Sequence, residues 1–338
     1  MHAPVLIATA ATATFGVVVT TIIRGRKTAN VCNPGERCET VLSSRYSNFL
    51  GFKLETLGLY YYVALVLAAL GGAFMTAAGM FSAEALDVYA FALLGFTGAG
   101  FAMSCYLTFV QAFYLRAWCP WCLRSAAAAT LSFGLAWLFY RESGADMLPI
   151  LVRANEALNI AHLVSFALAL VAATVSDVVV IRFMRTFAVS DVAERVFRYA
   201  TQVSVSLLFV VILTFVGLYL PDILLLNQAP AVLAQGIAVT LVAINVAFLN
   251  LFVSPYVYDM VARKTVSVAK ARAFRRIAFA LAATSFVSWY SAFALALYPD
   301  LDYHVSTILL GYGIAAVFAV LIGLAFESLS CGKRADVQ

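Results

Sequence analysis

The sequence predicts an all-α integral membrane protein with about nine transmembrane helices. Of its 338 residues, 64% are hydrophobic and only 12% are charged, whereas a typical soluble domain has about 25% charged residues. The apolar residues gather in long runs, and a helix needs a run of about 20 residues to cross a bilayer. Helices are the expected spanning elements because the lipid interior offers no partner to an unpaired backbone group.

Polar connections divide these runs and predict two domains. The connection over residues 24–55 is long, and the polar one over 141–156 predicts a boundary between residues 1–141 and 142–338. Basic residues give a net charge of +5 but sit in short clusters between the runs, as in membrane loops, so we expect no nucleic-acid partner. The predicted spans are 3–23, 56–81, 86–114, 121–140, 157–181, 200–221, 232–254, 277–298 and 305–327.

Four of the six cysteines form two close pairs. Cys119-Pro120-Trp121-Cys122 is a C-x-x-C motif at the start of the fourth run. At a helix N-terminus two such thiols can close a small disulfide ring, and backbone N–H groups stabilise a thiolate there. Cys32 and Cys38 flank a turn-forming Asn-Pro-Gly segment that can bring the second pair together.

Both pairs are expected on one face of the membrane, because two spans separate the 24–55 connection from the C-x-x-C. This layout predicts a thiol–disulfide relay, in which one pair exchanges with an external protein and the other meets a lipid-soluble oxidant. A zinc or iron–sulfur site is the alternative for four thiols. Structural zinc sites are usually built from C-x₂₋₄-C pairs, whereas five residues separate Cys32 from Cys38, so the sequence favours the relay and predicts no metal.

Further motifs accompany the two cysteine pairs. Val41-Leu42-Ser43-Ser44 follows Cys38 closely, Leu57-Gly58 opens the second run, and Trp118 precedes the C-x-x-C. With the paired loop cysteines, this combination resembles the vitamin K epoxide reductase family in its prokaryotic form. The resemblance covers about residues 1–141, and residues 142–338 resemble no family that we recognise.

The resemblance implies a four-helix bundle around a quinone and a role for each thiol. Cys122 would be the thiol nearest the quinone, and Cys119 its partner. Cys38 would be the loop thiol that exchanges with Cys119, and Cys32 the thiol that meets the outside reductant. Ser44 matches the loop serine whose hydroxyl can hydrogen-bond a quinone carbonyl, with Ser43 as the nearby alternative.

Two departures from the family refine the expected activity. Vertebrate members have a Tyr four residues after the second cysteine of the C-x-x-C, where this chain has Ala126, which favours quinone reduction over vitamin K epoxide chemistry. Many prokaryotic members carry a thioredoxin-like domain with its own C-x-x-C, and this sequence contains none. The thiol donor is therefore expected to be a separate thioredoxin-like protein.

Together these features predict a membrane thiol–disulfide oxidoreductase that promotes protein disulfide formation. Electrons would pass from the partner through Cys32/Cys38 and then Cys119/Cys122 to a quinone of the ubiquinone or menaquinone type. The alternative is a transporter or membrane scaffold, in which the cysteines form a structural disulfide and residues 142–338 hold the function.

The remaining polar and sulfur residues have less specific interpretations. His162 and Asp177 fall in the fifth run, and ionisable groups inside membranes are functional candidates by default, although Asp177 is near enough to the run's end to reach the interface. Cys105 is expected to be a packing residue, since a buried Cys behaves as a small hydrophobe. Nothing in the sequence marks Cys331 as functional.

The distribution of positive charge predicts the orientation of this multi-pass protein in the cell membrane. With nine spans, all but two of the 22 Lys and Arg fall on the side of the cysteines, the exceptions being Arg141 and Arg153. Positive loops stay in the cytoplasm, so the cysteines are predicted to face the cytosol, whereas prokaryotic members commonly place them on the exported face. A cytosolic disulfide generator suits a cell that keeps intracellular disulfides, as some hyperthermophiles do.

Overall fold

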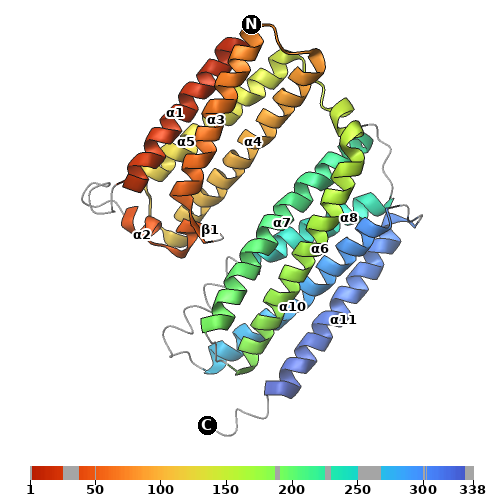
Figure 1. Ribbon diagram of the computed structural model, residues 1–338. Coiled ribbons are helices and arrows are strands. Elements are labelled where there is room, and N and C mark those ends of the chain that lie inside the picture. Colours follow the sequence, from red (N-terminus) through yellow and green to blue (C-terminus); the bar gives the residue numbers. More distant parts are fainter. Residues whose placement is uncertain are drawn as a thin grey trace. The chain divides into compact units, whose positions relative to one another are not determined.

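A computed structural model of the chain confirms the predicted all-helical membrane fold (Figure 1). Among the described residues, nine helices are long and apolar enough to cross a membrane. The chain divides into two compact units, Met1–Ile150 and Leu151–Gln338, a few residues beyond the predicted boundary. The structure describes residues 2–25, 38–49, 51–186, 191–224, 230–249, 268–299, 301 and 303–331.

The first unit is a bundle of four long helices. These helices are α1 (Ala3–Gly25), α3 (Leu54–Ala77), α4 (Ala83–Phe109) and α5 (Pro120–Ser143). Helix α1 packs against both α3 and α5, and α4 packs against α5. Close approach depends on small residues, as is usual between membrane helices: a Cβ atom added at Gly16 of α1 would overlap the ring of Tyr62 on α3.

Short elements connect these helices at the end of the bundle that carries the cysteines. Helix α2 (Cys38–Leu42) and the 3₁₀ turn η2 (Arg45–Ser47) precede a small antiparallel hairpin, whose turn places Gly51 at φ 85°. The hairpin pairs β1 (Asn48–Phe49) with β2 (Phe52–Lys53). After α4 the backbone widens into one turn of π-helix, η3 (Val110–Leu115), before it enters α5.

The second unit contains five long helices around a mixed aromatic and aliphatic core. Phe166, Val211 and Trp289 are almost fully buried at its centre. In contrast, α11 buries none of the residues in its most apolar window. The helices are α6 (Leu148–Thr186), α7 (Asp191–Leu224), α8 (Pro230–Phe248), α10 (Val268–Leu297) and α11 (Val305–Cys331).

Helices α6 and α7 extend beyond their predicted spans. Helix α6 begins at Leu148 rather than 157, so Arg153 and Glu156 lie on the exposed surface of its first turns instead of in a loop. At its other end α6 continues to Thr186, and α7 begins at Asp191. Most of the charged 182–199 stretch therefore belongs to the ends of these two helices.

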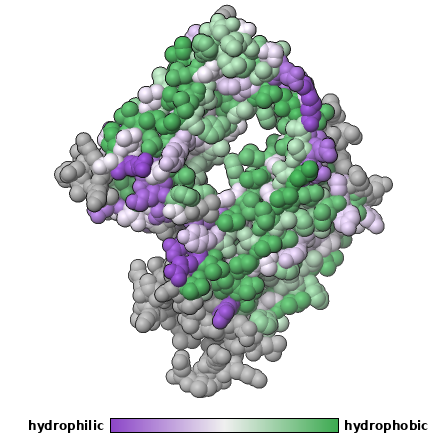
Figure 2. Space-filling view, in the orientation of Figure 1, coloured by the Kyte–Doolittle hydropathy of each residue, from purple (hydrophilic) through white to green (hydrophobic). Residues whose placement is uncertain are grey.

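The helix surfaces suit a lipid environment. Figure 2 shows apolar side chains covering most of the visible helix surface, with hydrophilic residues gathered towards helix ends and connections. Large apolar side chains such as Leu67, Phe74 and Leu310 are about two-thirds exposed. A water-soluble protein would not expose such residues over whole helices, so the spans are integral to a membrane.

Candidate dithiol site

The start of α5 holds two thiols in contact. Cys119 is the N-cap residue, Pro120 occupies the first helical position, where a missing N–H costs nothing, and the Cys119 sulfur accepts a hydrogen bond from the backbone N–H of Cys122 at 3.3 Å. The Cys122 thiol lies 2.8 Å from the Cys119 sulfur. Cys119 is fully buried and Cys122 is partly exposed, so of the two only Cys122 is open to a second reactant.

Gln111 holds the turn that carries this pair. Its side-chain oxygen accepts from the backbone N–H of Cys119 at 3.0 Å, and its backbone oxygen accepts from the N–H of Ala117 at 3.2 Å. Arg116, between them, has φ 46° and is the only non-glycine residue with positive φ in the described part of the chain. A π-helical turn and a left-handed residue are local strains of the kind found at functional sites.

The cysteine loop approaches the same turn through α2 and η2. Cys38 opens α2, is fully buried and is disulfide-bonded, and α2 packs against η3, the segment that carries Gln111. The ring of Tyr46 in η2 lies 6.1 Å from that of Tyr114 in η3. Cys32 lies outside the described residues, so its predicted place beside Cys38 stays a prediction.

The hydroxyl groups of the loop serines donate hydrogen bonds to nearby backbone oxygens. Ser44 donates to the backbone oxygen of Val41 at 2.7 Å, and Ser43 donates to that of Glu39 at 2.6 Å. The Ser44 backbone oxygen in turn accepts from the Ser47 hydroxyl at 2.7 Å. Either serine would have to rotate before it could donate to a quinone carbonyl.

The surroundings of Cys122 are aromatic and carry a few charges. Trp118 is half-exposed, and the Arg124 guanidinium lies 4.5 Å from the ring centroid of Trp121. The carboxylate of Glu55, in the first turn of α3, is close enough to act electrostatically on Cys122. One turn further along α5, the Tyr62 hydroxyl donates to the Ser125 backbone oxygen at 2.6 Å and ties α3 to the site.

The structure shows how His162, another candidate residue, is hydrogen-bonded. The Thr214 hydroxyl donates to the Val210 backbone oxygen, so it must accept from Nδ1–H of His162 at 2.8 Å. Nδ1 carries the proton, Nε2 is therefore the acceptor, and Gln235 donates to it at 3.0 Å. His162 is thus a neutral histidine with both nitrogens satisfied, and its contacts indicate a structural role.

The expectation for Cys105 is wrong. Its side chain is exposed on α4 rather than packed in the bundle. Facing a single polarizable thiol towards lipid costs little free energy. An apolar stretch of sequence therefore does not require the Cys105 side chain to be buried. The side chain of Cys331 lies outside the described residues.

Fold and site together define an integral membrane protein with a dithiol poised at a helix N-terminus on the apolar boundary. Residues 3–137 match the family model described as "Vitamin K epoxide reductase family". The first unit is therefore similar to that family, which implies a membrane thiol oxidoreductase. Comparison with curated proteins and with solved structures found no match.

Sequence reasoning missed two residues of this site. Gln111 is a lone amide in an apolar run, and polar groups inside membranes mark candidate functional positions, so that signal was available. Glu55 offered no such signal, because an acid in the first turn of a helix is common for reasons of the helix dipole alone. Its proximity to Cys122 depends on how α3 packs.

Proposed function

We propose that the first unit oxidises the thiols of a separate thioredoxin-like protein and passes the electrons to a membrane quinone, thereby promoting protein disulfide formation. The observation that carries the proposal is the thiol pair at the N-terminus of α5, with sulfurs 2.8 Å apart and Cys122 partly exposed. We assign residues 1–141 to this activity and leave residues 142–338 as an additional membrane domain.

Two exchanges conserve electrons along the relay. The partner's dithiol reduces the Cys32–Cys38 disulfide and becomes a disulfide itself. Cys38 then attacks Cys119 of the oxidised C-x-x-C, Cys122 leaves as a thiolate, and Cys32 resolves the mixed disulfide. This restores the Cys32–Cys38 disulfide and leaves Cys119 and Cys122 as two thiols, in keeping with a disulfide-bonded Cys38 and a reduced C-x-x-C.

The residues around Cys122 suit a quinone as the oxidant. Trp118 offers an exposed, flat apolar surface beside the dithiol, and Ser44 remains the candidate donor to a quinone carbonyl. A bound quinone supplies an acceptor for two electrons and two protons.

Quinone reduction by the purified full-length protein tests the proposal. We expect protein in lipid nanodiscs to reduce a soluble quinone analogue when given either a small dithiol or a reduced thioredoxin-like protein. Cys32→Ser should slow transfer from the protein donor far more than from the small dithiol, which can reach the C-x-x-C directly. Absence of quinol formation with both donors would contradict the activity.

We also propose the inverted orientation that the charge distribution predicts, with the cysteines on the cytosolic face and intracellular proteins as the clients. The test is labelling of Cys32 in intact cells by a membrane-impermeant maleimide after reduction. Labelling that requires permeabilised cells supports this orientation. Rapid labelling of intact cells returns the site to the exported face without affecting the proposed chemistry.

A further inference from the structure

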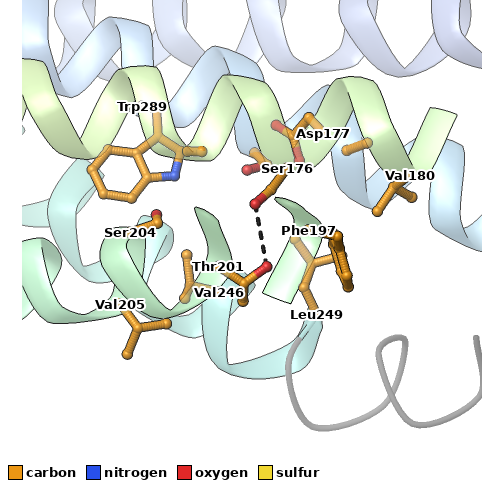
Figure 3. A pocket seen from close by; sticks show the side chains of 13 residues that line it. Ser176, Asp177, Val180, Phe197, Thr201, Ser204, Val205, Val246, Leu249 and Trp289 are labelled. Carbon is orange, nitrogen blue, oxygen red and sulfur yellow. Dashed lines mark hydrogen bonds between the residues drawn. The ribbon is translucent and has the colours of Figure 1, made fainter. Parts of the chain in front are cut away.

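The second unit contains a small cavity between four of its helices, with polar side chains within a mainly apolar lining (Figure 3). Its volume is about 50 Å³, room for a few waters, since one water requires roughly 10–15 Å³. It lies near the C-terminal ends of α6 and α8, in the N-terminal half of α7 and around the middle of α10. The polar lining residues are Ser176, Asp177, Thr201, Ser204, Ser285 and Trp289.

Two of these groups are incompletely paired. Asp177 has the Ser285 side chain as its hydrogen-bonding neighbour, and no described residue forms an ion pair with it. The indole Nε1–H of Trp289 is buried, in a side chain that is only 1% exposed, and no described residue accepts from it. In Figure 3 the Trp289 nitrogen turns towards the space between Ser176 and Ser204. Asp177 is partly exposed within the cavity. A carboxylate held among helices and a buried donor both cost free energy unless something pairs with them.

The remaining polar lining supplies neutral oxygens. The hydroxyls of Ser176 and Thr201 are 3.2 Å apart, and Ser204 is almost fully buried. Hard monovalent cations prefer oxygen ligands of this kind. A donor such as the Trp289 N–H cannot ligate a cation, but it can donate to a water that does.

The charge of the lining selects the class of ligand. Asp177 is the only titratable group among the described lining residues. The other helices contribute Phe197, Thr201, Ser204 and Val205 from α7, Val246 from α8 with Leu249 just beyond its end, and Ala282, Ser285 and Trp289 from α10. An anion would be repelled by the carboxylate, and an organic amine is too large for the volume. Arginines at the ends of the same helices are exposed, where salt screens their charge; they are Arg182, Arg195, Arg198 and Arg276.

We propose that this cavity binds a small monovalent cation, either Na⁺ or a proton held with water, with Asp177 as the charged ligand and the Trp289 N–H fixing a water beside it. The cation balances the carboxylate, and the water provides the acceptor that Trp289 lacks. The site is independent of the thiol relay. It gives the second unit an ion-binding role of its own.

Binding of radioactive sodium to the full chain in lipid nanodiscs, combined with infrared spectra of protonated carboxyl groups over a pH series, tests the site. We expect Asp177→Asn to weaken sodium binding at least about tenfold, the scale of a lost bond to a charged group. Glu156→Gln, an exposed carboxyl on the same helix, should bind as the wild type does. Ser204→Ala should weaken binding about two- to tenfold.

The two cations give different results. Sodium binding that Asp177→Asn abolishes identifies Na⁺. No sodium binding, with a titrating carboxyl band that Asp177→Asn removes and Glu156→Gln keeps, identifies the proton. Sodium binding and infrared bands that are the same in the wild type and Asp177→Asn overturn the proposal. If Asp177→Asn does not fold, unchanged sodium binding and an unchanged carboxyl band in Ser204→Ala overturn it instead.

Discussion

The two units treat the polar groups of their interiors in different ways. In the first unit, polar contacts join helices one pair at a time: Thr12 on α1 meets Ser132 on α5 at 3.1 Å, and Tyr62 on α3 meets Ser125. In the second, single polar residues from three helices meet inside the bundle, and some of their atoms stay unpaired. They include His162, Thr214 and Gln235, whose Oε1 has no partner.

The difference corresponds to the two proposed sites, a thiol relay in the first unit and a cation site in the second. The first unit carries its candidate dithiol at one end of the bundle, on two cysteines of a single motif, where we propose that a protein partner and a lipid-soluble oxidant meet it. Both units contain buried polar atoms without a described partner, such as Tyr61 Oη in the first and Trp289 Nε1 in the second, and these are expensive in lipid unless a ligand or water satisfies them. The thiol site is therefore contiguous in sequence, whereas the cavity is assembled from four helices.

The largest expected effect tests whether the units are independent. Cys122→Ser should abolish quinone reduction, because the thiol open to the oxidant is lost, while sodium or proton binding at Asp177 stays unchanged. Quinol formation and sodium binding measured on the same preparation check both halves of this expectation. Cys105→Ser is the control, since that thiol is exposed elsewhere on α4.

The companion change Cys119→Ser should behave differently. It leaves Cys122 as a single thiol, which can form a charge-transfer absorbance band with an added quinone but cannot complete turnover. Full activity in Cys122→Ser would end the relay hypothesis, and a loss of cation binding in the same variant would show that the units are coupled.

The second prediction concerns the turn that Gln111 holds. Gln111→Met keeps the length of the side chain but leaves the buried Cys119 N–H without an acceptor, at a cost of about 1–3 kcal/mol. We expect quinone reduction to fall about tenfold to a hundredfold, with a shifted reduction potential of the C-x-x-C. Gln111→Glu keeps an acceptor oxygen and should recover part of the loss.

A matched substitution in the other unit is the control for Gln111→Met. Gln202→Met on α7 makes the same replacement outside the thiol site and should leave both the rate and the potential unchanged. If Gln111→Met lowers the unfolding temperature without moving the reduction potential, Gln111 only stabilises the fold and does not position the dithiol.

The third prediction tests the structural role of the His162 network. Gln235→Leu removes the donor to His162 Nε2 but also removes the unpaired Oε1, so the net loss should be about 1 kcal/mol. Helices α6, α7 and α8 should then exchange backbone hydrogens faster, with an unchanged rate of quinone reduction. Unchanged exchange rates and an unchanged free energy of unfolding would contradict the structural role.

The sequence predicts local features of this molecule better than assembled ones. Hydropathy locates all nine spans because the lipid requirement acts on each helix separately, and Cys119 and Cys122 are recognisable because their spacing alone creates the site. Gln111 and the cavity were missed because they depend on packing. The proposed role of Asp177 depends on its proximity to Ser285 and Trp289, which lie more than a hundred residues further along the chain.

The smallest effect is expected for Ser44, where the structure changes the expectation. The family resemblance gives its hydroxyl to a quinone carbonyl, and one unmade bond would weaken quinone binding by about 1–2 kcal/mol. In the structure that hydroxyl donates to Val41 at 2.7 Å, so binding must first break an existing bond, and the net loss in Ser44→Ala should be about 0.5–1 kcal/mol. The Michaelis constant for quinone, measured against Ser43→Ala, is the readout. If Ser44→Ala and Ser43→Ala have the same Michaelis constant for quinone, both serines only stabilise the turn. A larger Michaelis constant in Ser44→Ala would show that its hydroxyl rotates to donate to the quinone.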